Sequence, residues 1–294
     1  MSLNSVNTNI GAQVALSSLN NTNTQLQASQ KRISTGLRVA DATDDGGAYA
    51  IAQRVRSDVG ALTSANEQLG NAKGLVGTTN SALSKISDSV NTAKTLLVKI
   101  GDQSLPQDQR DQYVASYKSL VSQVADTVDG ATYNGQTLLG KTGGTAGASK
   151  TVVSSEDGNS LTISGADNKD LASTLAGLIG LTFSRSGGAD TFSGTAAQTT
   201  AASALSGTSF SAAQKGVSDQ LNQIGADSNR LDATVLRNND KIDSLNAGLG
   251  ALIDTDLSKE SAKLQALQIK QQLGTQALSM ANQAPSSLVS LFRG

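Results

Sequence analysis

The chain has 294 residues, with 23 basic and 24 acidic side chains, so its formal net charge at pH 7 is −1. This balance provides no global field that would attract nucleic acid or an anionic membrane. The sequence contains no Cys and no His, which excludes disulfides, thiolate or imidazole metal sites, Cys nucleophiles and a Ser-His-Asp triad. We therefore expect no enzymatic activity and no bound cofactor or metal.

Bulky apolar side chains are scarce. Aromatic residues make up 3% of the chain and Trp is absent, which favours long, thin helical packing over one thick globular core. No apolar run reaches the roughly 18 residues needed to span a bilayer. The first positive charge is Lys31, so no Sec-type signal is visible. We expect no membrane insertion.

The N-terminal half predicts three helices. Residues 5–35 form the first, because apolar residues recur at spacings of three, four or seven; these are Val6, Ile10, Val14, Leu19, Leu26 and Ile33. After a break at Thr35-Gly36, the acidic and glycine-rich Asp44-Asp45-Gly46-Gly47 predicts the start of a second helix that reaches about Ile100. Pro106 at a first helical position predicts a third helix as far as Val128.

The middle of the chain changes composition. Asn134-Gly135 is a strong turn signal, and residues 141–211 are rich in Gly, Ser, Thr and Ala. One alternating pair, TVVSS and SLTIS, flanks Glu156-Asp157-Gly158-Asn159 and predicts a β-hairpin.

The C-terminal part has the most regular apolar repeat. A three-four spacing predicts a coiled-coil helix with apolar positions at Val217, Leu221, Ile224, Leu231, Val235, Ile242, Leu245, Leu249 and Leu252. Only Ser228 and Asn238 interrupt this repeat, and polar residues at such positions often fix register. A final helix starts at about Leu257.

Two short motifs permit a chemical interpretation and a structural one. Asp254 and Asp256 have an Asp-x-Asp spacing that could hold a metal through oxygen ligands, but capping of the last helix is favoured. Gly46-Gly47 could hold a phosphate at a helix start. Without a preceding apolar strand and a Lys-Ser/Thr pair, a plain helix start is favoured.

Sequence motifs at both ends of the chain resemble those of bacterial flagellin. Near the start, the resemblance lies in Ile33-Ser34-Thr35-Gly36-Leu37-Arg38, then Asp44-Asp45 and Ala50-Ile51-Ala52. Near the end, it lies in Asn229-Arg230-Leu231-Asp232, Asn238-Asn239, Asp254-Thr255-Asp256 and Ala281-Asn282-Gln283. Hook-filament junction proteins share this organisation of the two terminal segments but usually carry Pro beside the Asp-Asp pair. Thr43-Asp44-Asp45-Gly46 favours flagellin here.

The resemblance implies a mainly α protein: a long antiparallel helical bundle or coiled coil with both termini at one end and a small β-hairpin in the variable region. It also implies layers, which we expect as follows: residues 1–36 with 254–294 as inner-tube terminal helices, 37–44 with 251–253 as connectors, 45–140 with 211–250 as the outer-tube helical domain, and 141–210 as a variable, surface-exposed segment.

The implied function is mechanical: copies of the chain polymerise into the hollow flagellar filament used for swimming. We expect the polymerisation interface at Val14, Leu19, Leu26, Ile33, Leu264, Leu267, Leu273 and Leu278. We expect outer-tube packing at Val217, Leu221, Ile224, Leu231, Val235, Ile242 and Leu245.

The family also implies partners: an export chaperone, the cap and junction proteins, and a type III apparatus that secretes the subunit to the extracellular filament without a cleaved signal. Members sensed by the host flagellin receptor present an Arg and a Glu at the contact, with an adjacent apolar residue. The matching positions here are Thr92, Ser116 and Leu96, so we expect weak receptor activation.

Two alternatives remain open from the sequence: a hook-filament junction protein, and a coiled-coil surface protein that presents residues 141–210 to a ligand such as a polysaccharide.

Overall fold

The computed structural model describes residues 9–291, with side chains as far as Gln283, so Val6 of the first predicted helix lies outside it. The chain divides into two compact units, which we describe separately. Unit 1 comprises the segments up to Asp58 and from Asp243 onward, and unit 2 comprises residues 59–242.

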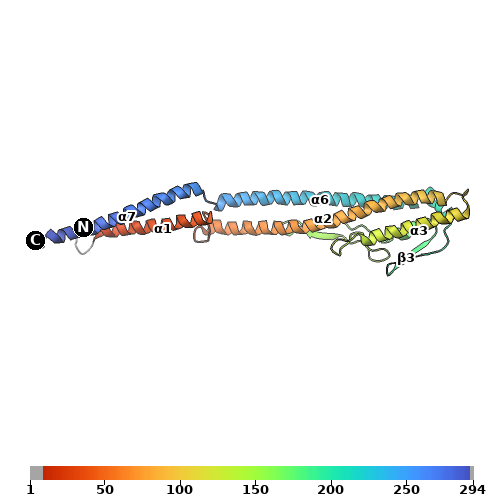
Figure 1. The fold of residues 1–294 in the computed structure, drawn as a ribbon, viewed down its shortest axis with the longest axis horizontal. Coiled ribbons are helices and arrows are strands. Elements are labelled where there is room, and N and C mark those ends of the chain that lie inside the picture. The colour runs from red at the N-terminus through yellow and green to blue at the C-terminus, as the bar shows by residue number, and fades with distance from the viewer. Residues whose placement is uncertain (1–8, 292–294) are drawn as a thin grey trace. The chain divides into compact units, whose positions relative to one another are not determined.

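Helices dominate the described residues, and the strands form two small hairpins (Figure 1). The helices are α1 (Ile10–Thr35), α2 (Gly46–Ile100), α3 (Gln107–Gly130), α4 (Leu171–Gly177), α5 (Gln198–Ser206), α6 (Ser209–Ile253) and α7 (Leu257–Leu291). The strands are β1 (Lys150–Val153) with β2 (Ser160–Ile163), and β3 (Thr182–Ser186) with β4 (Ala189–Ser193), each pair antiparallel. The predicted mainly α fold with a hairpin is confirmed. The hairpin β3–β4 and the short helices α4 and α5 were not predicted. No helix among the described residues is both long enough and apolar enough to cross a membrane.

In unit 1, α1 and α7 lie side by side and antiparallel (Figure 1). The Asn9 side chain at the start of α1 donates to the carbonyl of Ala281 (2.7 Å), and further along α1 the Asn23 side chain accepts from Gln271 (2.7 Å). Residue numbers thus rise along one helix as they fall along the other. The start of the described chain and the last part of α7 consequently lie at the same end of unit 1.

Two short connectors join these helices to the rest of unit 1, and they bind each other. The backbone N–H of Arg38 donates to the carbonyl of Ile253 (2.6 Å), and Thr255 N–H donates to the carbonyl of Gly36 (3.0 Å). Gly36 ends α1 at φ +71°, a left-handed conformation that glycine adopts without a side-chain clash. Val39 and Ile253 are 2% and 3% exposed within a small apolar cluster. The connectors are therefore packed and hydrogen bonded.

Ion pairs add to the first connector. The Lys31 ammonium lies 2.5 Å from an Asp41 carboxylate oxygen and 2.9 Å from one of Asp44. The Lys31 hydrogen bonds hold the pKa of both carboxyl groups below the usual Asp range, and hydrogen bonds from Thr43 contribute at Asp41. The same contacts raise the pKa of Lys31.

Two acidic residues of these motifs, Asp45 and Asp256, cap helix starts. Asp254 does not cap α7 as expected, because it lies just after α6, where its N–H donates to the carbonyl of Gly250 (2.9 Å) and it bridges to Leu37. The Asp45 side chain accepts from the N–H of Ala48 (3.0 Å) at the start of α2, and the Asp256 side chain accepts from the N–H groups of Ser258 (2.9 Å) and Lys259 (3.1 Å) at the start of α7. These are N-terminal caps, which satisfy free N–H groups. In the described chain, no three His, Cys, Asp or Glu residues cluster in a way that could hold a metal.

The core of unit 2 runs along α2, α3 and α6 and also takes in residues 141–210. That segment contributes buried apolar side chains at Ile163, Leu171, Leu175, Ile179 and Phe183. Tyr117 of α3 is 1% exposed, and its hydroxyl donates to the carbonyl of Leu175 (2.8 Å). Burial raises the pKa of Tyr117 well above its ordinary value. The Gly/Ser/Thr-rich segment is thus packed against the helices.

Buried polar side chains of α6 hold the hairpin β1–β2. Asn238, 3% exposed, donates to the carbonyl of Ser154 (3.0 Å) and to the side-chain oxygen of Asn66 on α2 (3.0 Å). Asp227, 2% exposed, accepts from the N–H of Ser164 (2.8 Å). Since directional hydrogen bonds replace apolar contacts here, the register between α2, α6 and the hairpin is specified.

A charge cluster fixes the second hairpin to α3. The Arg185 guanidinium lies 2.7 Å from Asp126, 2.9 Å from Asp129 and 2.5 Å from Asp190. The Arg185 side chain is 7% exposed, and its hydrogen bonds lower the pKa of Asp190. A planar guanidinium suits several carboxylates at once.

Candidate assembly interface

One face of α7 carries large apolar side chains that unit 1 leaves exposed. Ile269, Leu273 and Met280 are 58%, 58% and 66% exposed. They are four and seven residues apart, a spacing that places them on one side of a helix. We call these three residues the α7 stripe.

The opposite face of α7 packs on α1. Leu267 is 4% exposed and Glu260 is 7% exposed. Gly274 allows a close approach, because a Cβ built there would lie 3.3 Å from Leu19 Cδ1 of α1. The pairing of α1 with α7 therefore uses a different surface from the stripe.

Helix α1 adds exposed apolar residues of its own. Ile10, Val14 and Leu16 are 44%, 64% and 47% exposed. A shallow groove of about 710 Å³ follows the two helices. It is lined by Val14, Ser17, Ser18, Asn21, Thr22, Gln25, Lys270, Leu273, Gly274 and Ala277. The groove has one positive side chain, small polar walls and apolar contacts from both helices, a composition that suits a packed helix surface.

The polar contact near the start of α7 is incomplete. Arg32 Nη1 lies 3.9 Å from Glu260 Oε1 and Lys263 Nζ lies 3.6 Å from the same oxygen. Both distances exceed a hydrogen bond. Within the described side chains, Glu260 Oε1 and Arg32 Nε are buried without a hydrogen-bond partner. A buried unsatisfied group costs stability, so this contact contributes less than a fully hydrogen-bonded ion pair would.

The predicted interface residues fall into three groups. Val14 and Leu273 are exposed; five are half-buried, namely Leu19, Leu26, Ile33, Leu264 and Leu278. Leu267 is buried inside the subunit on the face that meets α1, so we assign it to the α1–α7 contact. The sequence interpretation omitted Ile269 and Met280, although their spacing from Leu273 was a readable signal.

The residues predicted to pack the outer layer lie along α6. Val217, Ile224 and Leu231 are at most 2% exposed. Leu221 and Val235 are partly buried against the same core, and Ile242 and Leu245 are half-buried.

The three positions compared with receptor contacts lie on α2 and α3. Thr92 and Ser116 are exposed, and each hydroxyl donates to a carbonyl of its own helix, that of Asp88 or Gln112. Leu96 packs partly against the core.

Comparison with known proteins identifies the family. Residues 6–143 match the bacterial flagellin N-terminal helical region and residues 209–292 match the bacterial flagellin C-terminal helical region. The chain is 36% identical to flagellin FljM of Caulobacter vibrioides over 295 residues, with 100% of both proteins covered. It is 34% identical to a flagellin of Brucella melitensis, with 99% of both covered. A crystal structure of Bacillus cereus flagellin aligns with a TM-score of 0.47 at 20% identity, covering 58% of this chain and 88% of that one. The chain belongs to the bacterial flagellin family.

Proposed function

We propose that this chain is a structural subunit of the bacterial flagellar filament and that α1 and α7 carry its main assembly contacts. Membership of the flagellin family supports the filament role. The observation that carries the assembly surface is the α7 stripe of Ile269, Leu273 and Met280, which unit 1 leaves exposed.

Exposed apolar area on α7 favours a contact between subunits. Isolated apolar residues on a surface are ordinary, but a stripe on one helix face is typical of a contact with another protein. An open helical polymer needs two different patches that meet head to tail. The α7 stripe is one candidate patch, and the exposed Ile10 and Val14 of α1, four residues apart on one side of that helix, offer another.

The proposed layers follow the expected boundaries. Residues 1–36 with 254–294 form the inner tube and 45–140 with 211–250 the outer tube, joined by 37–44 and 251–253, with 141–210 at the filament surface. The hydrogen bonds between the connectors support their role as a defined joint.

We further propose that the subunit is secreted through the flagellar type III apparatus with the help of an export chaperone, and that it meets cap and junction proteins at the extracellular filament. The support is the family resemblance. Thr92 and Ser116 in place of the Arg and Glu described above support weak activation of the host flagellin receptor.

Truncation tests the assembly role. Variants lacking residues 1–36 or 255–294 should stay folded in unit 2 and fail to elongate filament seeds, because either α1 with its exposed apolar residues or α7 with its stripe is missing. Sedimentation and negative-stain microscopy measure elongation, and circular dichroism with thermal melting verifies folding.

The same experiment separates the alternatives. Full-length protein that forms only discrete oligomers on seeds would favour the coiled-coil surface protein. Addition that stops after a short layer would favour a junction protein. Truncated variants that still elongate seeds would refute α1 and α7 as the assembly helices.

A further inference from the structure

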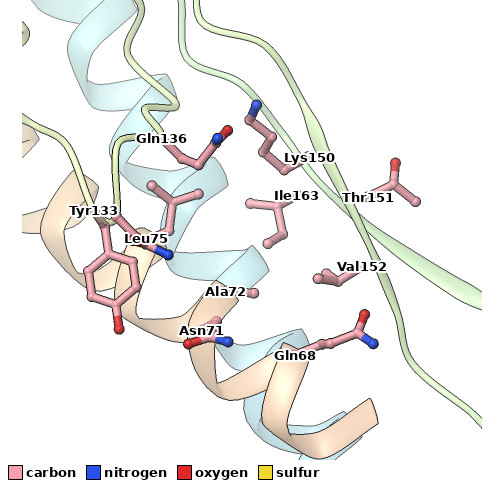
Figure 2. A pocket seen from close by; sticks show the side chains of 11 residues that line it. Gln68, Asn71, Ala72, Leu75, Tyr133, Gln136, Lys150, Thr151, Val152 and Ile163 are labelled. Atoms are coloured by element: carbon pink, nitrogen blue, oxygen red, sulfur yellow. The ribbon is translucent and has the colours of Figure 1, made fainter. Parts of the chain in front are cut away.

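A small pocket lies in unit 2 between α2, the 133–136 turn and the hairpin β1–β2 (Figure 2). Its volume is about 280 Å³, just below the usual range for ligand sites of roughly 300–1,000 Å³. Its apolar floor is formed by Ala72, Leu75, Val152 and Ile163. The pocket is large enough for one small ring and too small for an extended ligand.

The aromatic wall of this pocket is held in place by the backbone. Tyr133 and Gln136 exchange both backbone hydrogen bonds (2.9 Å each) around a two-residue turn. The turn residues Asn134 and Gly135 have φ of +50° and +73°, which matches a type I′ turn and its Asn-Gly preference. A Cβ at Gly74 would lie 2.5 Å from the Tyr133 ring, so glycine at that position lets the ring rest on α2. The ring is therefore preorganised.

The polar side chains around the pocket are unengaged. Figure 2 shows Gln68 and Asn71 on α2, Gln136 on the turn and Lys150 on β1 around the apolar floor. Across the residues that the structure describes, none of these four side chains makes a hydrogen bond or an ion pair. The Tyr133 hydroxyl also has no partner there. No carboxylate lines the pocket, so the Lys150 ammonium is its one charged group.

This chemistry selects a class of ligand. Amide side chains both donate and accept, as a ring of hydroxyl groups requires. An aromatic ring and an apolar floor suit the C–H face of a pyranose, and a free ammonium favours a carboxylate. We propose that the pocket binds an acidic monosaccharide unit, such as a uronic acid, with Lys150 at the carboxylate and the amides at the hydroxyl groups.

The test uses ¹⁵N-labelled full-length monomer, with D-galacturonic acid as the probe and D-galactose as its neutral match. Galacturonic acid should shift the amide signals of residues 68–75, 133–136 and 150–152. We expect a dissociation constant on the order of 1 mM, because a single ring makes few contacts. The acid should bind about tenfold more tightly than galactose, since hydrogen bonds to charged groups are the stronger ones.

Matched variants assign the contacts. Lys150→Gln should remove the preference for the acid, whereas Lys85→Gln, an exposed lysine of α2 outside the pocket, should retain it. Asn71→Ala, at an exposed helical position, should weaken the binding of both sugars. Equal effects of Lys150→Gln and Lys85→Gln, or shifts confined to other residues, would overturn the proposal. So would the absence of shifts with a protein whose spectrum shows it folded. Because the monomer is used, failure here is distinct from failure of filament assembly.

Discussion

Replacing Leu273 should weaken filament assembly and leave the monomer intact. Its side chain is 58% exposed in the subunit, and full burial of a Leu side chain is worth about 1.5–3 kcal/mol. Burying the remaining 58% in an intersubunit contact therefore contributes about 0.9–1.7 kcal/mol. Leu273→Ala, which keeps one methyl group, should lose about 1 kcal/mol and raise the critical concentration for elongation about fivefold.

Leu273→Asp should have a much larger effect. A carboxylate placed in a dry contact without a partner costs several kcal/mol, so the critical concentration should rise by more than about 100-fold. Gln272→Asp is the matched control, because it introduces the same charge at an exposed position beside the α7 stripe.

The assay is seeded elongation followed by sedimentation at fixed ionic strength, with circular dichroism of the monomer as the folding control. Elongation of Leu273→Asp at the wild-type critical concentration would show that Leu273 is not in the interface. Equal damage from Gln272→Asp would show that the effect follows the added charge and not the position on the α7 stripe.

Three further predictions follow from separate parts of the subunit. Asn238→Ala should lower the free energy of unfolding of unit 2 by about 1–3 kcal/mol, because the carbonyl of the buried Ser154 and the side-chain oxygen of the half-buried Asn66 lose their donor; an unchanged urea midpoint would contradict a structural role. Because Lys31 lowers the pKa of Asp41, the stability from this pair is complete above the unfolded Asp pKa of about 3.9 and is lost as the pH falls toward the lowered value. The melting temperature of the filament should accordingly fall less between about pH 5 and pH 3 in Asp41→Asn than in wild type. Parallel curves of melting temperature against pH would argue against a stabilising role for the Lys31–Asp41 pair. Thr92→Arg combined with Ser116→Glu should raise receptor activation in a reporter-cell assay, and wild-type monomer already as potent as an Arg- and Glu-bearing flagellin would show the comparison to be wrong.

The long helices could be read from the sequence because their apolar residues repeat at helical spacing. The hairpin β1–β2 was readable for a similar reason, since LTI alternates apolar and polar residues and TVV is β-branched throughout. The short helix α4 and the hairpin β3–β4 depend on contacts distant in sequence: Tyr117 holds Leu175, and Arg185 reaches Asp126 and Asp129. Gly, Ser and Thr carry little local signal of such contacts.

The polar interruptions of α6 show the same limit. Asn238 is buried and bonded across the bundle, as a register-fixing residue should be. At the other interruption, the neighbouring Asp227 is the buried residue and Ser228 is only half-buried. Periodicity locates a face to within a residue, and only the partner, here the N–H of Ser164, decides which side chain occupies it.

The candidate interface could be predicted only as a set of apolar positions. Leu267 and Leu273 look equivalent in the sequence, yet one is 4% exposed and the other 58%. The difference arises because α1 covers one face of α7, and that pairing is not encoded in the spacing of either helix alone.

A helical reconstruction of filaments grown from this chain would show directly which helix faces are buried between subunits. We expect α1 and α7 to line the inner part of the tube, and Ile269, Leu273 and Met280 to be buried against neighbouring subunits. Filaments in which these three side chains face solvent, with assembly contacts made elsewhere, would contradict this expectation.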